Sequence, residues 1–316
     1  MKYSGKKVSS SRTWKQKFHI HTGERLNWFQ IILRLQGSIL TNIIPWVASF
    51  AGYSLIIVLL DYDEKYLPLP KITAGVPNII LSLNLILSLL LVFRLNAAYD
   101  RYWEGRKLWG ALVNSVRNLT RGIAIEIKVD SKPDRLEKEE TVRLVVAFAI
   151  ATKLHLRRKP VDEQLIALMS LSRYSKLKNT NHQPLKVAFW IGEYLQERYR
   201  CNFLDVYQLT TLQNLLDDLV NILGGCERIL KTPTPLALPI LLKQLLILYC
   251  LSLPIEMVDT LKWLTVPIIV VITSILFGIE EISSELENPF GQNPNNLPLD
   301  VICDEISKNA EELIRS

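Results

Sequence analysis

Long uncharged apolar runs dominate the pattern of this chain. Residues 35–60 contain no charged side chain over 26 positions, and residues 72–93 contain none over 22. A membrane-spanning helix needs about 20 predominantly apolar residues, so both runs are long enough to cross a bilayer. Two later runs are weaker, because residues 236–255 include Lys243 and residues 263–279 are uncharged over only 17 positions. The alternative for this second pair is two buried helices of a soluble core. Beside two clear spans, we interpret the second pair as membrane-spanning as well.

The sequence therefore predicts an all-α integral membrane protein with four spans. Their expected ranges are 43–61, 77–95, 237–255 and 263–281. Residues 96–235 are expected to form a large cytoplasmic helical region, and residues 282–316 a cytoplasmic tail. The mean hydropathy of +0.17 agrees with a chain divided between lipid and water. We interpret residues 1–316 as a single subunit.

The placement of charge predicts the orientation. The formal net charge of +6 could suit nucleic acid or a membrane surface. Basic side chains are concentrated in the leader, residues 1–17, and after the second span, at Arg94, Arg101, Arg106, Lys107 and Arg117. The short linkers 61–75 and 256–262 carry both signs of charge. The positive-inside rule then places both termini in the cytoplasm. Topology explains the basic excess, so a nucleic-acid partner is not expected.

Local signals divide the cytoplasmic region. Helical spacing of apolar residues predicts helices over 141–156 and 209–223. Gly224 and Gly225 indicate a helix stop after the second of these. The charged segment 128–140 contains Pro133 and is interpreted as a solvated connector. In the tail, residues 301–314 are predicted to form a short amphipathic helix.

The sequence carries no signature of an enzyme. It has no P-loop, no GxGxxG, no HExxH and no nucleophile elbow, and its four cysteines form no CxxC pair. We therefore expect no catalytic residue, no cofactor and no metal site. His19 and His21 are interpreted as solvated, and His155 and His182 as isolated. The neighbouring carboxylates of Glu280 and Glu281 are expected to be solvated at the membrane interface or to pair between subunits.

The second span carries the most specific pattern. Leu85, Leu89 and Phe93 recur every four residues and fall on one slowly drifting helix face. Taken alone, this spacing favours ordinary helix packing over a pore-lining role. The pattern contains no glycine or proline from Asn78 until Gly105, so the helix is expected to continue well beyond the bilayer.

The residues that follow this face resemble a known family. The run Phe93–Gly110, FRLNAAYDRYWEGRKLWG, is similar to the signature of the bestrophins in their prokaryotic branch. Further segments agree in order along residues 25–310: Ile43-Ile44-Pro45-Trp46, Gly224-Gly225-Cys226-Glu227-Arg228-Ile229 with Thr232-Pro233, Ile279-Glu280-Glu281, Glu287-Asn288-Pro289-Phe290-Gly291, and Leu297-Pro298-Leu299-Asp300.

The resemblance implies a homopentamer around one central pore, permeable to chloride and other small anions, bicarbonate among them. It places three apolar rings of a membrane neck at Leu85, Leu89 and Phe93, and a cytoplasmic aperture near Leu209 or Thr210. The implied partners are further copies of the chain, membrane lipid and permeant anions. The implied location is the bacterial inner (plasma) membrane or a thylakoid membrane. The alternatives are a cation-conducting bestrophin relative and a carrier or scaffold subunit that forms no channel.

One segment departs from the animal bestrophins, whose calcium gating uses acidic residues directly after the Asn-Pro-Phe-Gly motif. Here that motif is followed by Gln292–Asn296, which contains no carboxylate. Amide oxygens and the nearby Asp300 remain as ligands, but calcium affinity falls as the ligand charge falls. We therefore expect opening without micromolar calcium.

Overall fold

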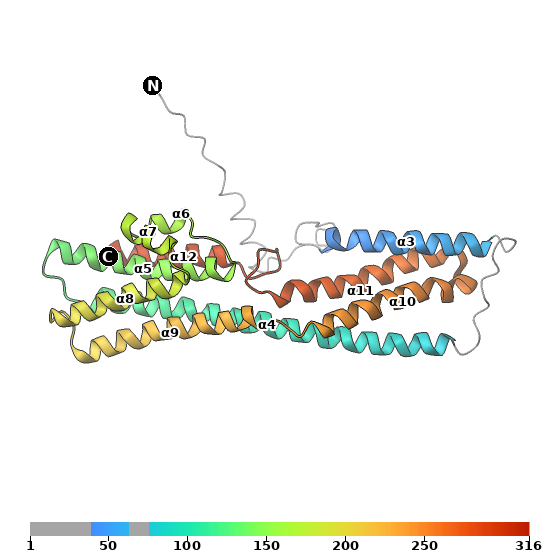
Figure 1. Ribbon diagram of the computed structural model, residues 1–316, viewed down its shortest axis with the longest axis horizontal. Coiled ribbons are helices and arrows are strands. Elements are labelled where there is room, and N and C mark those ends of the chain that lie inside the picture. The colour runs from blue at the N-terminus through green and yellow to red at the C-terminus, as the bar shows by residue number, and fades with distance from the viewer. Residues whose placement is uncertain (1–38, 63–75, 316) are drawn as a thin grey trace, which may run out of the picture. The chain divides into compact units, whose positions relative to one another are not determined.

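The computed structural model describes residues 39–62 and 76–315, and these residues form helices and turns but no strand (Figure 1). The basic leader, His19, His21 and most of the first linker lie outside the described residues. The chain divides into two compact units. Among the described residues, the apolar unit contains residues 39–62, 76–107 and 226–297, and the polar unit contains residues 108–225 and 298–315.

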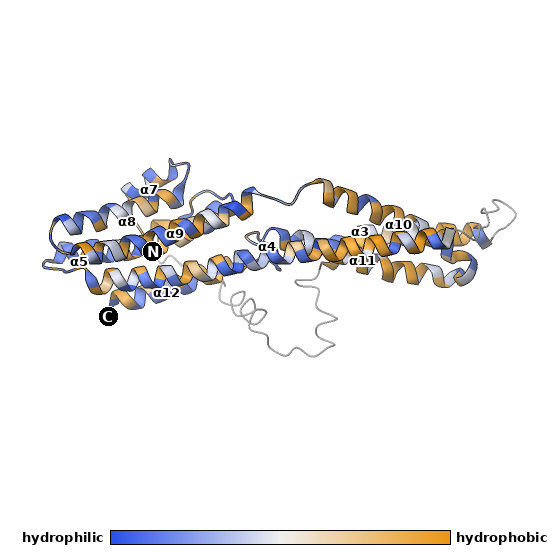
Figure 2. Cartoon of the chain, turned by 90° about the horizontal axis from the view of Figure 1, so that it is seen from below, coloured by the Kyte–Doolittle hydropathy of each residue, from blue (hydrophilic) through white to orange (hydrophobic). Residues whose placement is uncertain are grey.

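The apolar unit is a bundle of hydrophobic helices. It contains α3 (Leu40–Tyr62), the first part of α4 (Val76–Glu126), the end of α9 (Val206–Lys231), α10 (Ala237–Leu261), the short 3-10 helix η1 (Lys262–Leu264) and α11 (Thr265–Glu287). Helices α3, α10 and α11 pack against one another. Their colouring in Figure 2 is predominantly hydrophobic. Leu87, Leu242, Cys250 and Ile269 are fully buried in the core of this unit.

Within the described residues, three stretches are long and apolar enough to cross a membrane: Leu40–Asp61, Asn78–Glu126 and Ala237–Glu287. The third is divided at η1, where Lys262 has a positive φ of 48° and α10 ends. The first three expected spans lie within α3, α4 and α10. The fourth begins in η1 and continues through α11.

Helix α4 is the longest element, and its length confirms the prediction that the helix of the second span continues well beyond the bilayer. It has 51 residues, far more than the roughly 20 that a bilayer requires. The boundary between the two units falls inside this helix, between Lys107 and Leu108.

The polar unit has its own hydrophobic core. It contains the second part of α4, α5 (Lys132–Leu156), α6 (Glu163–Ile166), α7 (Leu171–Lys178), α8 (Gln183–Arg200), most of α9, and α12 (Leu299–Arg315). Helix α5 packs against both α8 and α12. It contributes Leu144, Ala147 and Phe148, which are fully buried. Helix α12 matches the amphipathic helix expected over residues 301–314.

Two sequence interpretations of this unit were wrong. Residues 128–140 are not all a connector, because α5 begins at Lys132 with Pro133 in its first turn. Proline is tolerated there because the first N–H groups of a helix have no partner within the helix. The side chain of Ser131 caps this helix by accepting a hydrogen bond from the N–H of Asp134 at 3.3 Å.

Gly224 and Gly225 do not stop α9, which continues to Lys231. A Cβ added at Gly225 would lie only 3.0 Å from a side-chain carbon of Leu108 on α4. Gly225 therefore allows two helices to approach closely rather than ending one of them. The actual end of α9 precedes Thr232-Pro233, where proline cannot continue the helical hydrogen bonding.

Candidate functional site

The three candidate neck residues share an exposed face of α4. Leu85, Leu89 and Phe93 are 73%, 54% and 58% exposed within the subunit. The opposite face is buried, with Leu87 at 0% and Leu91 at 3%. Packing inside one subunit therefore does not account for the exposed residues. Other apolar residues of α4 are also exposed, Leu81 and Val92 among them, so exposure alone does not select the three.

Polar groups at the same depth of α4 are satisfied locally. The Ser82 hydroxyl donates to the carbonyl oxygen of Asn78 at 2.8 Å, and the Ser88 hydroxyl donates to Oδ1 of Asn84 at 3.4 Å. These hydroxyls consequently need no partner from another subunit.

The carboxylates of Glu280 and Glu281 both have partners inside the subunit, and Glu280 is buried rather than solvated as expected. Oε1 of the buried Glu280 lies 3.4 Å from Nζ of Lys243, and Oε1 of Glu281 accepts from the Asn42 amide at 2.8 Å. Lys243, the charge that interrupts the third apolar run, thus has its counter-charge on the neighbouring helix. Its own side chain remains 58% exposed.

Arg94 follows Phe93 directly but points into the subunit, with only 3% of the residue exposed. Its Nη2 lies 2.7 Å from Oε2 of Glu287, and its Nη1 donates to the Thr234 hydroxyl at 3.2 Å. The backbone N–H and the hydroxyl of Thr234 both donate to Oε1 of Glu287. Sequence reasoning had counted Arg94 only among the topology-setting charges. No local signal in the sequence marks this arginine as buried, because its partners Thr234 and Glu287 are distant in the chain.

The two candidate aperture residues on α9 are placed differently. Leu209 is 8% exposed and belongs to the buried face of the helix. Thr210 is exposed, and its hydroxyl donates to the carbonyl oxygen of Val206 at 2.8 Å.

The segment after the Asn-Pro-Phe-Gly motif is held by amide donors. The Asn295 amide donates to Oε2 of Glu285 at 2.6 Å, and the Asn296 amide donates to the carbonyl oxygen of Glu285 at 2.8 Å. Oδ1 of Asn296 accepts from the N–H of Asn293 at 2.8 Å. The polar groups of this turn therefore have hydrogen-bond partners within the turn and on Glu285.

Asp300 lies in the first turn of α12 and is bound by two cations, Lys153 in the last turn of α5 and Arg157 directly after that helix. Its Oδ2 accepts from Arg157 at 2.8 Å and its Oδ1 from Lys153 at 3.1 Å. Burial raises the pKa of the Asp300 carboxyl, but hydrogen bonds and charge from Arg157 and Lys153 outweigh it and hold the pKa below its usual value.

A depressed pKa makes this contact pH-dependent. The stabilisation is present above the unfolded-state pKa of about 3.9 and is lost as the pH falls through the lower folded-state pKa. We expect the wild-type protein to lose thermal stability between about pH 5 and pH 2 more steeply than Asp300→Asn does. Thermal unfolding across this range measures the difference. Parallel curves for the two proteins would contradict the assignment.

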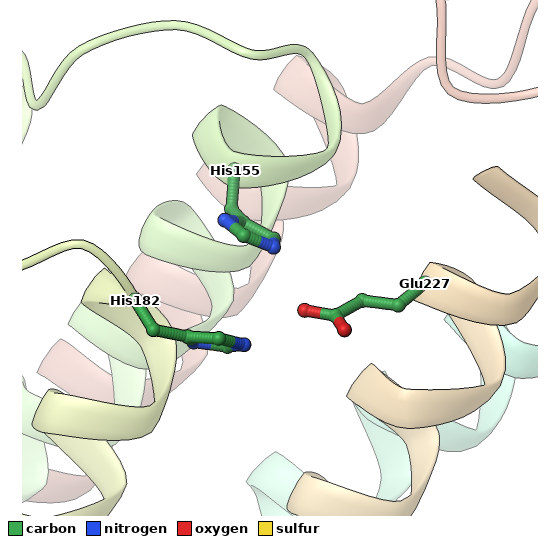
Figure 3. Close-up of side chains that lie close together, drawn as sticks. All are labelled: His155, His182 and Glu227. Carbon is green, nitrogen blue, oxygen red and sulfur yellow. The ribbon is translucent and has the colours of Figure 1, made fainter. Parts of the chain in front are cut away.

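Two histidines that are distant in sequence lie together in the polar unit. The rings of His155, in the last turn of α5, and His182, at the start of α8, stack with centroids 4.7 Å apart (Figure 3). The interpretation of these residues as isolated was therefore wrong. Sequence periodicity gave no signal, because a helix end and a helix start meet only through the packing of α5 on α8.

The hydrogen bonding of His182 limits what this pair binds. Its Nδ1 accepts from the N–H of Leu185 at 3.4 Å, so the neutral ring carries its proton on Nε2. A metal ion on Nε2 would move that proton to Nδ1 and remove this helix cap. Two rings are also fewer than the three or four protein ligands of zinc sites. Glu227, also drawn in Figure 3, pairs with Lys231 of its own helix at 2.7 Å.

The long apolar helices and the exposed apolar face of α4 define a polytopic helical membrane protein. Residues 20–312 match the model of the bacterial and fungal bestrophin proteins, and the chain belongs to this family. It is 49% identical over 292 residues to a voltage-dependent anion channel-forming protein of Nostoc sp. (strain PCC 7120), covering 92% of this chain and 93% of that protein. It is 46% identical over 288 residues to a protein of the same description from Synechocystis sp. (strain PCC 6803), covering 91% and 92%.

A solved structure agrees in fold. The crystal structure of a bacterial bestrophin homolog from Klebsiella pneumoniae superposes with a TM-score of 0.78 at 26% sequence identity. The match covers 87% of this chain and 99% of that one.

Proposed function

We propose that this protein is the subunit of an anion channel, with chloride and other small anions, including bicarbonate, as permeant ions. The observation that carries the proposal is its similarity, over nine-tenths of its length, to relatives described as voltage-dependent anion channel-forming. The proposed location is a bacterial inner (plasma) membrane or thylakoid membrane, with four spans and both termini in the cytoplasm. The concentration of basic residues in the leader and after the second span supports this orientation.

The proposed pore runs along the exposed face of α4 in a ring of five subunits. Leu85, Leu89 and Phe93 would form three apolar rings of a neck, which is supported by their exposure and common face. Such rings offer no ligand that replaces the hydration shell of an ion, so a narrow ring dewets and closes the path. A wider ring favours weakly hydrated anions over strongly hydrated small cations. At the cytoplasmic aperture we propose Thr210 rather than Leu209, because only Thr210 is exposed.

Reversal potentials test the permeant ion. The purified full-length protein is placed in a planar bilayer under a KCl gradient, and the current is recorded against voltage. An anion channel reverses near the chloride equilibrium potential, and a cation-conducting bestrophin relative reverses near that of potassium. Unitary current steps distinguish a channel from a carrier or scaffold subunit. Replacing chloride by bicarbonate on one side then measures whether bicarbonate permeates.

The first structural prediction is a stable oligomer. Lys243 lies within the apolar helix α10 with its side chain 58% exposed, and α4 of the same unit carries an exposed apolar face. Charged groups at membrane depth normally face protein or a water-filled cavity. We therefore expect an oligomer that persists in mild detergent, with a mass of five subunits by light scattering. A strictly monomeric mass would exclude the pore.

A further prediction concerns the response of the channel to calcium. In the turn after the Asn-Pro-Phe-Gly motif, the Asn295 and Asn296 amides donate hydrogen bonds to Glu285. A site of neutral amides and few carboxylates binds calcium only in the range of about 10⁻⁴–10⁻³ M or more weakly. We expect the same current in a calcium chelator as in added micromolar calcium on one bilayer. Steep activation at micromolar calcium would mean that ligands outside this turn build a site.

A further inference from the structure

Arg101 joins the ends of two helices within the apolar unit. Its Nη2 donates to the carbonyl oxygen of Ile229, in the last turn of α9, at 2.7 Å, and its Nη1 to that of Thr232, directly after this helix, at 2.6 Å. Its Nε donates to the carbonyl oxygen of Glu287, the last residue of α11, at 3.1 Å. The last carbonyl groups of a helix lack partners within that helix and carry partial negative charge. One guanidinium therefore satisfies both helix ends with its rigid fork of donors.

The same face of α4 makes two more contacts with these segments. Arg94 lies seven residues before Arg101, two helical turns away, and binds Glu287. Gly105 lies four residues after Arg101, and a Cβ added there would be 3.0 Å from Cγ of Pro289 in the turn after α11. From Arg94 to Gly105, one side of α4 is thus held by directional polar bonds and a close backbone approach.

Nearer the middle of the span, α4 is held differently. Ile80, Leu87 and Leu91 pack in the apolar core with α3, α10 and α11. Apolar contacts are non-directional and resist rotation or sliding of a helix only through shape. Hydrogen bonds weaken steeply when their angle or length changes. The rotation of α4 at Phe93 is consequently fixed most strongly by the polar contacts that begin one residue later.

We propose that Arg101 is a positioning residue for the pore, because its three carbonyl contacts set the rotation and height of α4 at Phe93. The proposal rests on the proposed channel function, in which Phe93 faces the ion path. Arg101 itself touches no ion. Arg101 acts through α4, because its hydrogen bonds hold this helix against the ends of α9 and α11.

A cysteine reporter tests this positioning without ion current. Phe93→Cys is made in a Cys201→Ser background, since Cys201 is the exposed cysteine among the four and the others are buried. The rate of modification by a charged methanethiosulfonate reagent is compared with and without Arg101→Gln. We expect a change of about fivefold at position 93, the size usual for residues that couple two sites. Arg101→Lys retains the charge at both helix ends and should shift the rate less.

Matched controls separate positioning from general loosening. A reporter at Leu81→Cys, 66% exposed and three turns earlier on α4, should keep its rate. Glu104→Gln removes the exposed ion pair with Arg228, 2.6 Å long, and should leave the rate at 93 unchanged. Equal changes at positions 93 and 81, or no change at 93, would overturn the proposal.

Single-channel recording then connects the position of Phe93 to conduction. Arg101→Gln should change the open probability, and this change should shrink when Leu89→Ala has already widened the neck, because both act on one constriction. If the wild type carries no current but the reporter at 93 responds, the channel proposal fails and the positioning role stands. If the wild type conducts and neither reporter nor current responds to Arg101→Gln, the positioning role fails and the channel stands.

Discussion

Leu89→Ala should produce a larger single-channel current or a higher open probability than the wild type. Leu89 would contribute one side chain per subunit to the middle apolar ring of the proposed neck. Shortening five such side chains widens the narrowest part of the path and makes it easier for water, and hence for a hydrated ion, to enter. Because Leu89 is 54% exposed within the subunit, its removal leaves no cavity there. The change in subunit stability should therefore stay within about 0.5 kcal/mol.

Leu87 provides a matched control on the opposite face of α4. It is fully buried in the core of the apolar unit. Leu87→Ala should reduce stability by about 2–5 kcal/mol, the usual result of a buried cavity, without a larger current. Single-channel recording and thermal unfolding of both variants give the comparison. If Leu89→Ala leaves the current unchanged and lowers stability as much as Leu87→Ala does, Leu89 is a packing residue and the neck must be sought elsewhere.

The elements that sequence reasoning located correctly are those with long, uniform patterns. A run such as residues 72–93 has few alternatives, since apolar helices of this length suit only a membrane or a very large core. The errors occurred where one residue type has two physical uses. Pro133 can end a segment or occupy the first turn of a helix, and Gly225 can stop a helix or admit the side chain of Leu108. Tertiary contacts decide between these uses, and they are not encoded in local spacing.

The candidate site residues also divide into those that a local pattern predicts and those that only tertiary contacts reveal. The face that carries Leu85, Leu89 and Phe93 is set by helical periodicity and could be read from the sequence. The burial of Arg94 could not, because its partners Thr234 and Glu287 lie more than 130 residues away in the chain. The same is true of the contact between His155 and His182, which depends on how α5 packs against α8. Long-range polar pairs thus need the fold before they can be recognised.

The Arg94–Glu287 pair should be the largest single polar contribution to the stability of the apolar unit. The side chains are 4% and 18% exposed, and Thr234 supplies two further donors to the same carboxylate. Removing one partner of a buried pair leaves the other charge uncompensated, at a cost of about 3–5 kcal/mol. Arg94→Met should therefore lower the thermal unfolding midpoint in detergent strongly.

The double variant Arg94→Met with Glu287→Gln separates the charge effect from lost packing. Replacing both charges removes the uncompensated carboxylate, so the double variant should be less destabilised than the sum of the two single variants. The exposed pair Arg228–Glu104, with side chains 69% and 42% exposed, is the control, and Arg228→Gln should cost only about 0–1 kcal/mol. Strict additivity of the two single effects, or a loss for Arg94→Met no greater than that for Arg228→Gln, would show that the buried pair contributes no more than an exposed one.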